Sequence, residues 1–319
     1  MEPADPLSFN RLVVLFNPEG TSAPKVKKII TSLEKAHPGK VVVDETKPSV
    51  AGNLKVLKKV LKPGDILLPC GGDGTLGQVV SALLDPTISK AMQSIPVLPV
   101  GTGKMNDVAH MLNGRHFANP LYVLRHAQLT PIYPLTCTIT PANKAGKPDV
   151  RMAVYNIGFG SIGLGTVHYN EPEYRDKQKK RPTLVQDLVA VGVFAKTWRE
   201  AAMFDVTYKG KRQQMLDLFF SNGNIMAGYW RFPAKLQKKE FFVGIVSEKT
   251  IRSVTRTAVG LLANKFPTGE LTKDPVEFTL HEEVYAEIDG EWFTTPPSCK
   301  VHISHHRQPV MMLATADMA

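Results

Sequence analysis

The chain of 319 residues is 43% hydrophobic and 21% charged, a composition typical of a folded globular protein and not of a disordered one. Its length suffices for two ordinary domains, and no apolar run approaches the ~18 residues that a membrane-spanning helix needs. The first residues lack the basic flank and apolar core of a signal peptide. Cys70, Cys137 and Cys299 have neither disulfide-framework nor zinc-site spacing. These features predict a cytoplasmic protein.

The formal net charge of +10 favours a polyanionic partner, which means nucleic acid, an anionic membrane surface or a phosphate-rich substrate. Two local basic groups stand out, one within residues 175–181 and one formed by Arg231, Lys235, Lys238 and Lys239. Neither group carries the interleaved aromatic residues of a surface that binds single-stranded nucleic acid. Charge alone leaves open whether these groups dock a partner or are solvated loops.

Short apolar runs alternate with helical patterns through the first third of the chain. Strands are predicted at residues 12–16, 41–43, 66–68 and 95–100, with apolar residues at helical spacing at 26–33, 54–61 and 76–84. This alternation predicts a Rossmann-like α/β domain, in which helices cover both faces of a parallel sheet. Ligands of such folds bind beyond the carboxyl ends of the strands.

Beyond residue 131 the pattern changes to short strands joined by turns, which predicts an antiparallel, β-sandwich-like second domain. The expected strands are residues 132–139, 151–157, 204–208, 215–221, 241–246, 276–280, 284–288 and 300–304. Helices are expected at 184–203 and 251–264. The predicted domains are 1–131 and 132–305, and the segment 306–319, with its apolar run 310–313, is expected to return to the first domain.

A glycine cluster, Gly71-Gly72-Asp73-Gly74-Thr75, lies between a predicted strand and a predicted helix. Glycines there allow positive φ and let backbone N–H groups approach phosphate oxygens, while the helix N-terminus adds partial positive charge. Asp73 is a candidate to orient a nucleotide group or a hydrated magnesium ion, and Thr75 offers a hydroxyl. An ordinary strand–helix turn requires fewer glycines.

A second cluster, Gly101-Thr102-Gly103, follows the next strand, and Asn106-Asp107 is expected to cap the helix that begins near Val108. Two adjacent glycine loops suggest one nucleotide cradle. Neither loop matches the P-loop pattern or the dinucleotide-binding pattern G-x-G-x-x-G, so a dinucleotide oxidoreductase has little support.

Taken together, these loops resemble the diacylglycerol kinase catalytic-domain family, which includes sphingosine kinases and bacterial lipid kinases. The resemblance extends over nearly the whole chain. Its other matching segments are Asn17-Pro18, Asn156-Ile157-Gly158-Phe159-Gly160, Ser221-Asn222-Gly223 followed by Pro233-Ala234, and Asp289-Gly290-Glu291. Gly-Gly-Asp-Gly also occurs in NAD kinases and phosphofructokinases, and the later segments favour the lipid kinases.

The resemblance implies an ATP- and magnesium-dependent lipid kinase that phosphorylates a diacylglycerol-like hydroxyl at a membrane surface. It implies that Asp289 and Glu291 face the nucleotide across a cleft and that one of them is the base. The implied nucleotide contacts are Asn17, Thr46, Gly71, Gly72, Asp73, Gly74, Thr75, Gly101, Thr102, Gly103 and Asn106. The basic groups, with Tyr229, Trp230 and Phe232 as candidate apolar anchors, would contact an anionic membrane.

Three departures from the family pattern affect this hypothesis. Lys104 and Met105 are inserted before Asn106, His110 replaces a common Arg, and residues 236–240 carry Lys238 and Lys239 where bacterial members have metal-associated acids. The metal ligands therefore stay unassigned. Alternatives are a catalytically weak nucleotide- or lipid-binding protein of the same fold, or a kinase of NAD or a sugar phosphate. The sequence predicts neither the lipid nor the oligomeric state.

Overall fold

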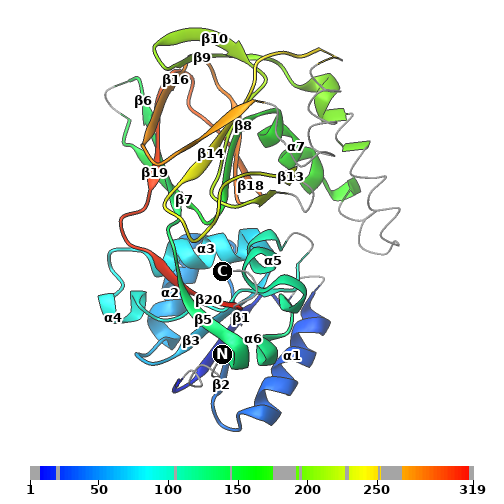
Figure 1. The fold of residues 1–319 in the computed structure, drawn as a ribbon, viewed down its shortest axis with the longest axis vertical. Coiled ribbons are helices and arrows are strands. Elements are labelled where there is room, and N and C mark those ends of the chain that lie inside the picture. Colours follow the sequence, from blue (N-terminus) through cyan, green and yellow to red (C-terminus); the bar gives the residue numbers. More distant parts are fainter. Residues whose placement is uncertain are drawn as a thin grey trace.

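The chain forms two lobes that lie end to end (Figure 1). The structure is a computed structural model, and it describes residues 8–18, 22–103, 106–143, 146–174, 192–193, 196–226, 230–250, 252 and 268–315. The predicted combination of a parallel α/β domain and an antiparallel β-rich domain is confirmed. The predicted boundaries at 131/132 and 305/306 stay predictions.

The first lobe is built on a parallel sheet with the strand order β2-β1-β3-β4. Its strands are β1 (Leu12–Phe16), β2 (Val41–Glu45), β3 (Ile66–Gly71) and β4 (Val100–Gly101). Its helices are α1 (Ala23–Ala36), α2 (Val50–Val60), α3 (Asp73–Leu83), α4 (Lys90–Gln93), α5 (Asp107–Asn113), the 3₁₀ turn η1 (Gly114–His116) and α6 (Pro120–His126). Strands β1 and β3 are almost wholly buried, as their uninterrupted apolar sequences require.

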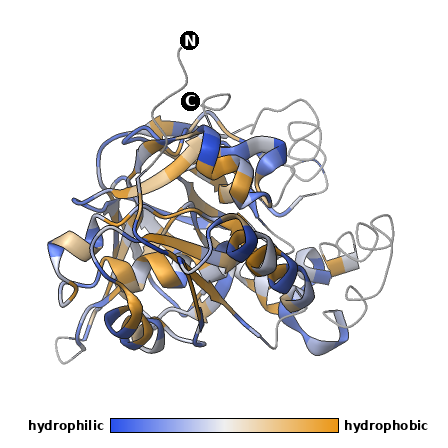
Figure 2. Ribbon diagram, turned by 90° about the horizontal axis from the view of Figure 1, so that it is seen from below, coloured by the Kyte–Doolittle hydropathy of each residue, from blue (hydrophilic) through white to orange (hydrophobic). Residues whose placement is uncertain are grey.

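Helix α1 shows how the sequence places these helices. Pro24 lies in its first turn, where proline's missing N–H removes no helical hydrogen bond. Val26 and Leu33 are buried, and the intervening lysines face solvent. Figure 2 shows the same separation across the fold, with hydrophobic residues concentrated on the strands and hydrophilic residues on the outer turns and helix faces.

The second lobe is a sandwich of two six-stranded sheets, ordered β10-β9-β16-β19-β6-β7 and β15-β14-β11-β8-β17-β18. The first sheet comprises β6 (Leu135–Pro141), β7 (Asp149–Ala153), β9 (Phe204–Tyr208), β10 (Lys211–Met215), β16 (Val276–Leu280) and β19 (Cys299–His305). The second comprises β8 (Asn156–Gly160), β11 (Asp217–Ser221), β14 (Phe241–Val246), β15 (Gly269–Thr272), β17 (Tyr285–Ile288) and β18 (Glu291–Thr294). Outside these sheets lie α7 (Ser161–Asn170) and a small ribbon of β12 (Ile225–Met226) and β13 (Trp230–Arg231). Between the sheets, the aromatic rings of Phe220 and Phe278 stack on each other, and the ring of Phe159 meets both of them edge to face.

The chain crosses between the lobes more than once. Strand β5 (Ala127–Ile132) pairs antiparallel with β20 (Val310–Thr315), and Met312 also bridges Val97 of the first lobe. The last strand therefore returns to the first lobe, where Figure 1 draws it in red beside β5. The chain therefore crosses between the lobes at 133–134 and again at 306–309, and backbone pairing holds its last strand in the first lobe.

Three predicted strands differ from those observed, for identifiable reasons. Residues 132–139 divide between β5 and β6, which pair with different strands. Pro134, which has no N–H to donate, lies between the two. Residues 95–100 contain Pro96 and Pro99, so only Val97 and the short β4 pair. Residues 151–157 divide into β7 and β8 because the N–H groups of Val154 and Tyr155 donate to a carboxylate instead.

Several predicted features lie wholly or mostly outside the described residues. These are the basic run within 175–181, the inserted Lys104-Met105, most of the expected helices 184–203 and 251–264, and the side chains of Tyr229 and Trp230. Phe232 is described, and the proposal that it is a membrane anchor is wrong. Its side chain is buried and stacks on Phe242 with ring centroids 5.2 Å apart.

Candidate active site

The carboxyl ends of the parallel strands gather the predicted nucleotide contacts at one edge of the sheet. Asn17 follows β1 and is exposed, and Thr46 follows β2 with its backbone N–H donating to the carbonyl of Phe16 at 3.0 Å. The two glycine loops follow β3 and β4. Because β1 lies between β2 and β3, this arrangement brings the predicted contacts from four strand ends to one edge.

The two glycine loops pack directly against each other. The backbone N–H groups of Thr102 and Gly103 both donate to the carbonyl of Gly71, at 3.0 and 3.1 Å. A Cβ at Gly103 would lie 2.5 Å from the backbone nitrogen of Gly72, so a glycine is required at this contact. The loops thus form one continuous backbone surface at the N-terminus of α3.

Asp73 joins this surface to the next helix. Its carboxylate accepts hydrogen bonds from the backbone N–H groups of Asp107 at 2.9 Å and Val108 at 3.1 Å, and so caps α5. Asn106 holds the N-cap position of α5, as predicted, but its side chain makes no capping hydrogen bond and donates to the Gly103 carbonyl instead. Both oxygens of Asp73 are occupied and the residue is only 4% exposed, which does not fit a magnesium-orienting role. Burial, followed by the charge of Asp107, raises the pKa of Asp73 to about 8.

Two polar atoms near these loops are buried without a hydrogen-bond partner, namely the hydroxyl of Thr102 and the amide oxygen of Asn106. Unpaired buried polar atoms are uncommon because each loses its hydration without replacement. Both residues belong to the predicted nucleotide contacts. Their unpaired atoms support the prediction that a polar ligand binds at the second glycine loop.

The acidic turn of the second lobe reaches this region as a tight hairpin between β17 and β18. Asp289 and Gly290 are its central residues, with φ of +48° and +87°, the conformation of a type I′ turn, which an Asp-Gly pair adopts readily. The Asp289 carboxylate accepts backbone hydrogen bonds from Val154, Tyr155 and Asn156 at 2.6, 3.1 and 3.1 Å. It is 3% exposed, and burial raises its pKa to about 6.

Glu291 differs from Asp289 in facing the open space between the lobes. It is exposed, and its Oε1 accepts a hydrogen bond from the side-chain amide of Gln78 at 3.3 Å. The same oxygen lies 3.1 Å from the position a Cβ on Gly74 would occupy. Gly74 belongs to the first turn of α3, where the helix dipole favours a negatively charged side chain.

Gly74 and Gly77 give α3 a flat face on which the acidic turn packs. A Cβ at Gly77 would lie 2.6 Å from a carboxylate oxygen of Asp289, and one at Gly74 would lie 3.3 Å from the Asp289 carbonyl. The absence of these two side chains lets the turn approach the helix. The glycines of this segment therefore position the second lobe as well as shaping the loop.

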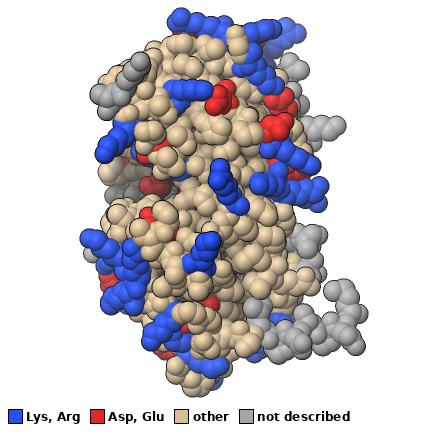
Figure 3. All heavy atoms as spheres, turned by 90° about the vertical axis from the view of Figure 1, so that its left-hand side faces the viewer, with Lys and Arg blue, Asp and Glu red and all other residues tan. Residues whose placement is uncertain are grey.

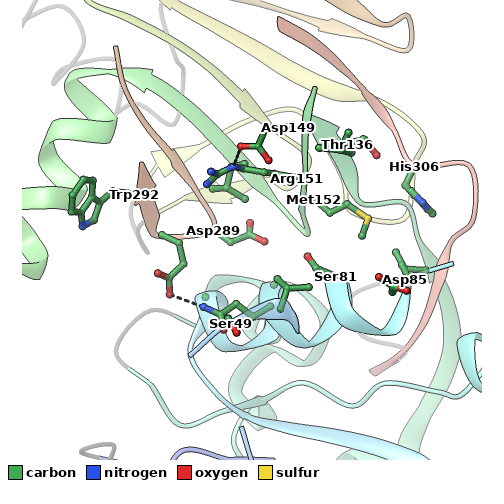
Figure 4. A pocket seen from close by; sticks show the side chains of 18 of the residues that line it. Ser49, Ser81, Asp85, Thr136, Asp149, Arg151, Met152, Asp289, Trp292 and His306 are labelled. Carbon is green, nitrogen blue, oxygen red and sulfur yellow. Dashed lines mark hydrogen bonds and ion pairs between the residues drawn. The ribbon is translucent and has the colours of Figure 1, made fainter. Parts of the chain in front are cut away.

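A cleft of about 630 Å³ opens between the lobes beside this contact. In Figure 4, Ser49, Ser81 and Asp85 lie on the first-lobe side, while Thr136, Met152 and Asp289 face them from the second lobe and Trp292 lies at the left edge of the view. Arg151 projects from β7, ion-paired with Asp149 at 2.7 Å. Val50, Val150 and Trp292 also line the cleft, and their side chains are among the exposed large apolar ones. The cleft thus combines polar groups near Glu291 with an apolar rim.

Two residues for which the sequence indicated no role make buried hydrogen bonds near the site, and these bonds are seen only in the folded structure. Glu287 is 2% exposed and accepts hydrogen bonds from the Asn156 side chain at 2.7 Å and from the Gly290 N–H at 2.8 Å. Asn222 joins the second lobe to the linker by donating to the carbonyls of Tyr133 and Val154. Both lie in or beside segments singled out by the resemblance, but residue type alone does not indicate these contacts.

We expect Glu287 to make stability depend on pH. Burial raises the pKa of Glu287 to about 8, above its unfolded value, so the folded protein holds a proton that the unfolded chain releases between about pH 5 and 8. Stability should therefore fall as pH rises through this window and level off above it. In Glu287→Gln the free energy of unfolding should decrease less steeply with pH than in the wild type. The two slopes should differ by up to about 1 kcal/mol per pH unit. Urea unfolding at several pH values measures this, and equal slopes in both proteins would contradict it.

The described residues contain no group of three or more His, Cys, Asp or Glu side chains arranged to hold a metal ion. At residues 236–240, Lys238 pairs with Glu240 at 3.8 Å, and the Lys239 ammonium lies 5.4 Å from the Tyr133 ring centroid. Among those same residues, no helix is both long and apolar enough to cross a membrane.

Comparisons with known proteins agree with this geometry. Residues 11–136 match the family model described as the diacylglycerol kinase catalytic domain. A crystal structure of a diacylglycerol kinase from Bacillus anthracis str. Sterne superposes with a TM-score of 0.66 and 18% identity, covering 98% of this chain and 99% of that chain. Yeast NADH kinase complexed with NADH superposes with a TM-score of 0.56 and 12% identity, covering 99% of this chain and 89% of that chain. A search of curated proteins gave no match.

The resemblance to the diacylglycerol kinase family is confirmed over residues 11–136, the part of the chain that the family model covers. At such low sequence identities the solved structures establish the two-lobed fold alone. The match of residues 11–136 is to the catalytic-domain model of a kinase family, and it does not identify the acceptor.

Proposed function

We propose that this protein is a kinase that transfers the γ-phosphate of ATP to a lipid hydroxyl, most simply that of diacylglycerol. The nucleotide would lie against the two glycine loops, contacted by Asn17, Thr46 and Thr102. The acceptor hydroxyl would lie in the cleft next to Glu291. Phosphoryl transfer needs positioning, charge neutralisation and a group that accepts the proton of the attacking hydroxyl.

The observation that carries this proposal is the different environment of the two carboxylates in the acidic turn. Asp289 is buried and saturated by three backbone N–H groups. Glu291 is exposed at the N-terminus of α3, directly across from the glycine surface. We therefore assign the base to Glu291 and a structural role to Asp289.

The rim of the cleft supports a lipid acceptor. Val50 is 39% exposed, Val150 60% and Trp292 48%, and all three line the same cleft. An exposed apolar group of this kind is expected where an apolar ligand or surface covers it. A water-soluble acceptor such as a sugar phosphate would not account for exposed apolar side chains at this rim.

An assay of radiolabelled γ-phosphate transfer from ATP to diacylglycerol in mixed micelles tests the proposal. The panel of acceptors should include sphingosine, other hydroxyl-bearing lipids and NADH. We expect transfer to at least one lipid and little transfer to NADH. A second candidate function is that of a kinase of a nucleotide cofactor, and the structural likeness to yeast NADH kinase favours it. Transfer to NADH alone would support this second candidate. Nucleotide binding without transfer to any acceptor would indicate a binding protein of the same fold.

Magnesium is expected to be bound with the nucleotide, because no metal-holding cluster occurs among the described side chains. Transfer should require magnesium. In the absence of nucleotide, however, millimolar magnesium should leave the Tm almost unchanged, measured by differential scanning fluorimetry with and without ATP. A large stabilisation by magnesium alone would reveal a protein-built site and contradict this expectation.

Membrane contact is proposed through basic side chains. Arg231, Lys235, Lys238 and Lys239 are exposed on the second lobe, and each basic residue near an anionic surface contributes about 1 kcal/mol. On the face drawn in Figure 3, Lys and Arg flank the hollow between the lobes on both sides. Binding to vesicles rich in phosphatidylserine should weaken steeply with salt. Replacing Lys235 and Lys239 with Glu should weaken it further, and sedimentation indifferent to both changes would refute the docking.

A further inference from the structure

A chain of side-chain amides links the nucleotide side of the cleft to Glu291. It begins at Lys47, which directly follows the predicted nucleotide contact Thr46. The buried Asn53 of α2 accepts from the Lys47 N–H at 2.8 Å and donates to the Lys47 carbonyl at 3.0 Å. Its amide nitrogen also donates to the side-chain oxygen of Gln78 at 3.4 Å, and the Gln78 amide nitrogen donates to Glu291 at 3.3 Å.

The backbone of Lys47 fixes the direction of every bond in this chain. A backbone N–H donates only and a carbonyl accepts only, so Asn53 must present its oxygen to the first and its amine to the second. The remaining N–H of that amine faces Gln78 and requires an acceptor there. Gln78 must therefore turn its oxygen toward Asn53 and its amine toward Glu291.

We propose that Gln78 is the positioning residue for Glu291, with Asn53 holding the Gln78 amide in the one orientation that donates to the carboxylate. This inference rests on the proposed function, in which Glu291 is the base. Holding Glu291 by a donor on α3 places the carboxylate of the second lobe at a defined point beside the glycine loop. A hydrogen bond to the charged form of a carboxylate favours that form, so this donor is expected to favour the ionised form of Glu291.

Other charged groups that line the cleft must be considered with Glu291. They are Asp289 on the same hairpin, Asp149 and Arg151 on β7, Asp85 just beyond the end of α3, and His306. Asp289 is occupied by backbone N–H groups, Arg151 is paired with Asp149, and Asp85 accepts from the Thr87 N–H at 2.9 Å. The Gln78 amide donates directly to the Glu291 carboxylate.

The test compares Gln78→Met and Gln78→Glu with the wild type. Met keeps the length of the side chain but removes the donor, and Glu replaces the donor with a like charge. Both should lower kcat, by about tenfold or more, with little change in the KM for ATP. The acidic limb of the kcat–pH profile should move to higher pH, by about one unit for Glu and less for Met. Gln213→Met, the same change at an exposed position of β10, should alter neither quantity.

A second readout does not need turnover. The ¹³C carboxyl resonance of Glu291, identified by its absence in Glu291→Gln, reports the titration midpoint of this side chain directly. Gln78→Met and Gln78→Glu should raise that midpoint. Asn53→Asp, which keeps the acceptor for the Lys47 N–H but removes the amine facing Gln78, should raise it as well.

The outcomes separate this inference from the proposed function. A wild-type protein inactive toward every acceptor overturns the kinase proposal, while the carboxyl titration still decides the role of Gln78. An unchanged midpoint and unchanged kcat in both Gln78 variants overturn the positioning role. A midpoint that moves in the Gln78 variants but not in Asn53→Asp overturns the part assigned to Asn53.

Discussion

Replacing Glu291 with Gln is expected to lower kcat for lipid phosphorylation by about 10²-fold or more, with the KM for ATP nearly unchanged. The substitution keeps the size of the side chain but removes its ability to accept a proton. Because Glu291 is exposed, the Tm should stay within a few degrees of the wild type. Steady-state kinetics with radiolabelled ATP and micellar lipid measures the effect.

Glu282→Gln provides a control, because Glu282 is an exposed acid on the same lobe that does not line the cleft. Its backbone contact is with the Asp205 N–H at 2.7 Å, which Gln can also satisfy through its oxygen. It should retain wild-type kcat. If Glu291→Gln instead loses ATP affinity at unchanged kcat, this carboxylate belongs to the nucleotide site and the base is elsewhere.

Unlike Glu291→Gln, which should lose activity and keep its stability, Asp289→Asn is expected to lose much of its stability. The carboxylate satisfies three buried N–H groups, and an amide nitrogen in place of one oxygen would face the N–H of either Val154 or Tyr155. Leaving a buried donor unpaired costs about 1–3 kcal/mol, and a broken network costs more. Because the turn packs on Gly77, misplacing it should also move Glu291 and lower activity. Thermal and urea unfolding measure the loss.

Asp149→Asn is a suitable comparison for this change. It replaces an exposed carboxylate that pairs with the partly exposed Arg151, and ion pairs near the surface contribute little. Its stability should stay close to that of the wild type. An Asp289→Asn protein as stable as the wild type but catalytically dead would return Asp289 to the role of base.

The sequence by itself determined the class of the fold and the position of the two glycine loops. Apolar runs 12–16 and 66–68 match β1 and β3 because buried parallel strands require continuous apolar residues. The glycines at 71–74 and 101–103 mark strand ends because few other residues fit there. These signals depend on residues that are close together in the chain, so they can be recognised from the sequence alone. The same holds for the Asp289-Gly290 turn.

Only the tertiary structure decided what the acidic side chains do. Asp73 and Asp289 both belong to motifs that suggest catalysis, yet each has its carboxylate occupied by backbone N–H groups distant in sequence. Gln78 attracts no attention in the sequence, yet it contacts Glu291 across 213 positions. Hydrogen-bond partners and burial are set by which segments the fold brings together. Burial and hydrogen-bond partners therefore distinguish Asp289, which holds the lobes in contact, from Glu291, which faces the cleft. Residue type and spacing in the sequence do not make this distinction.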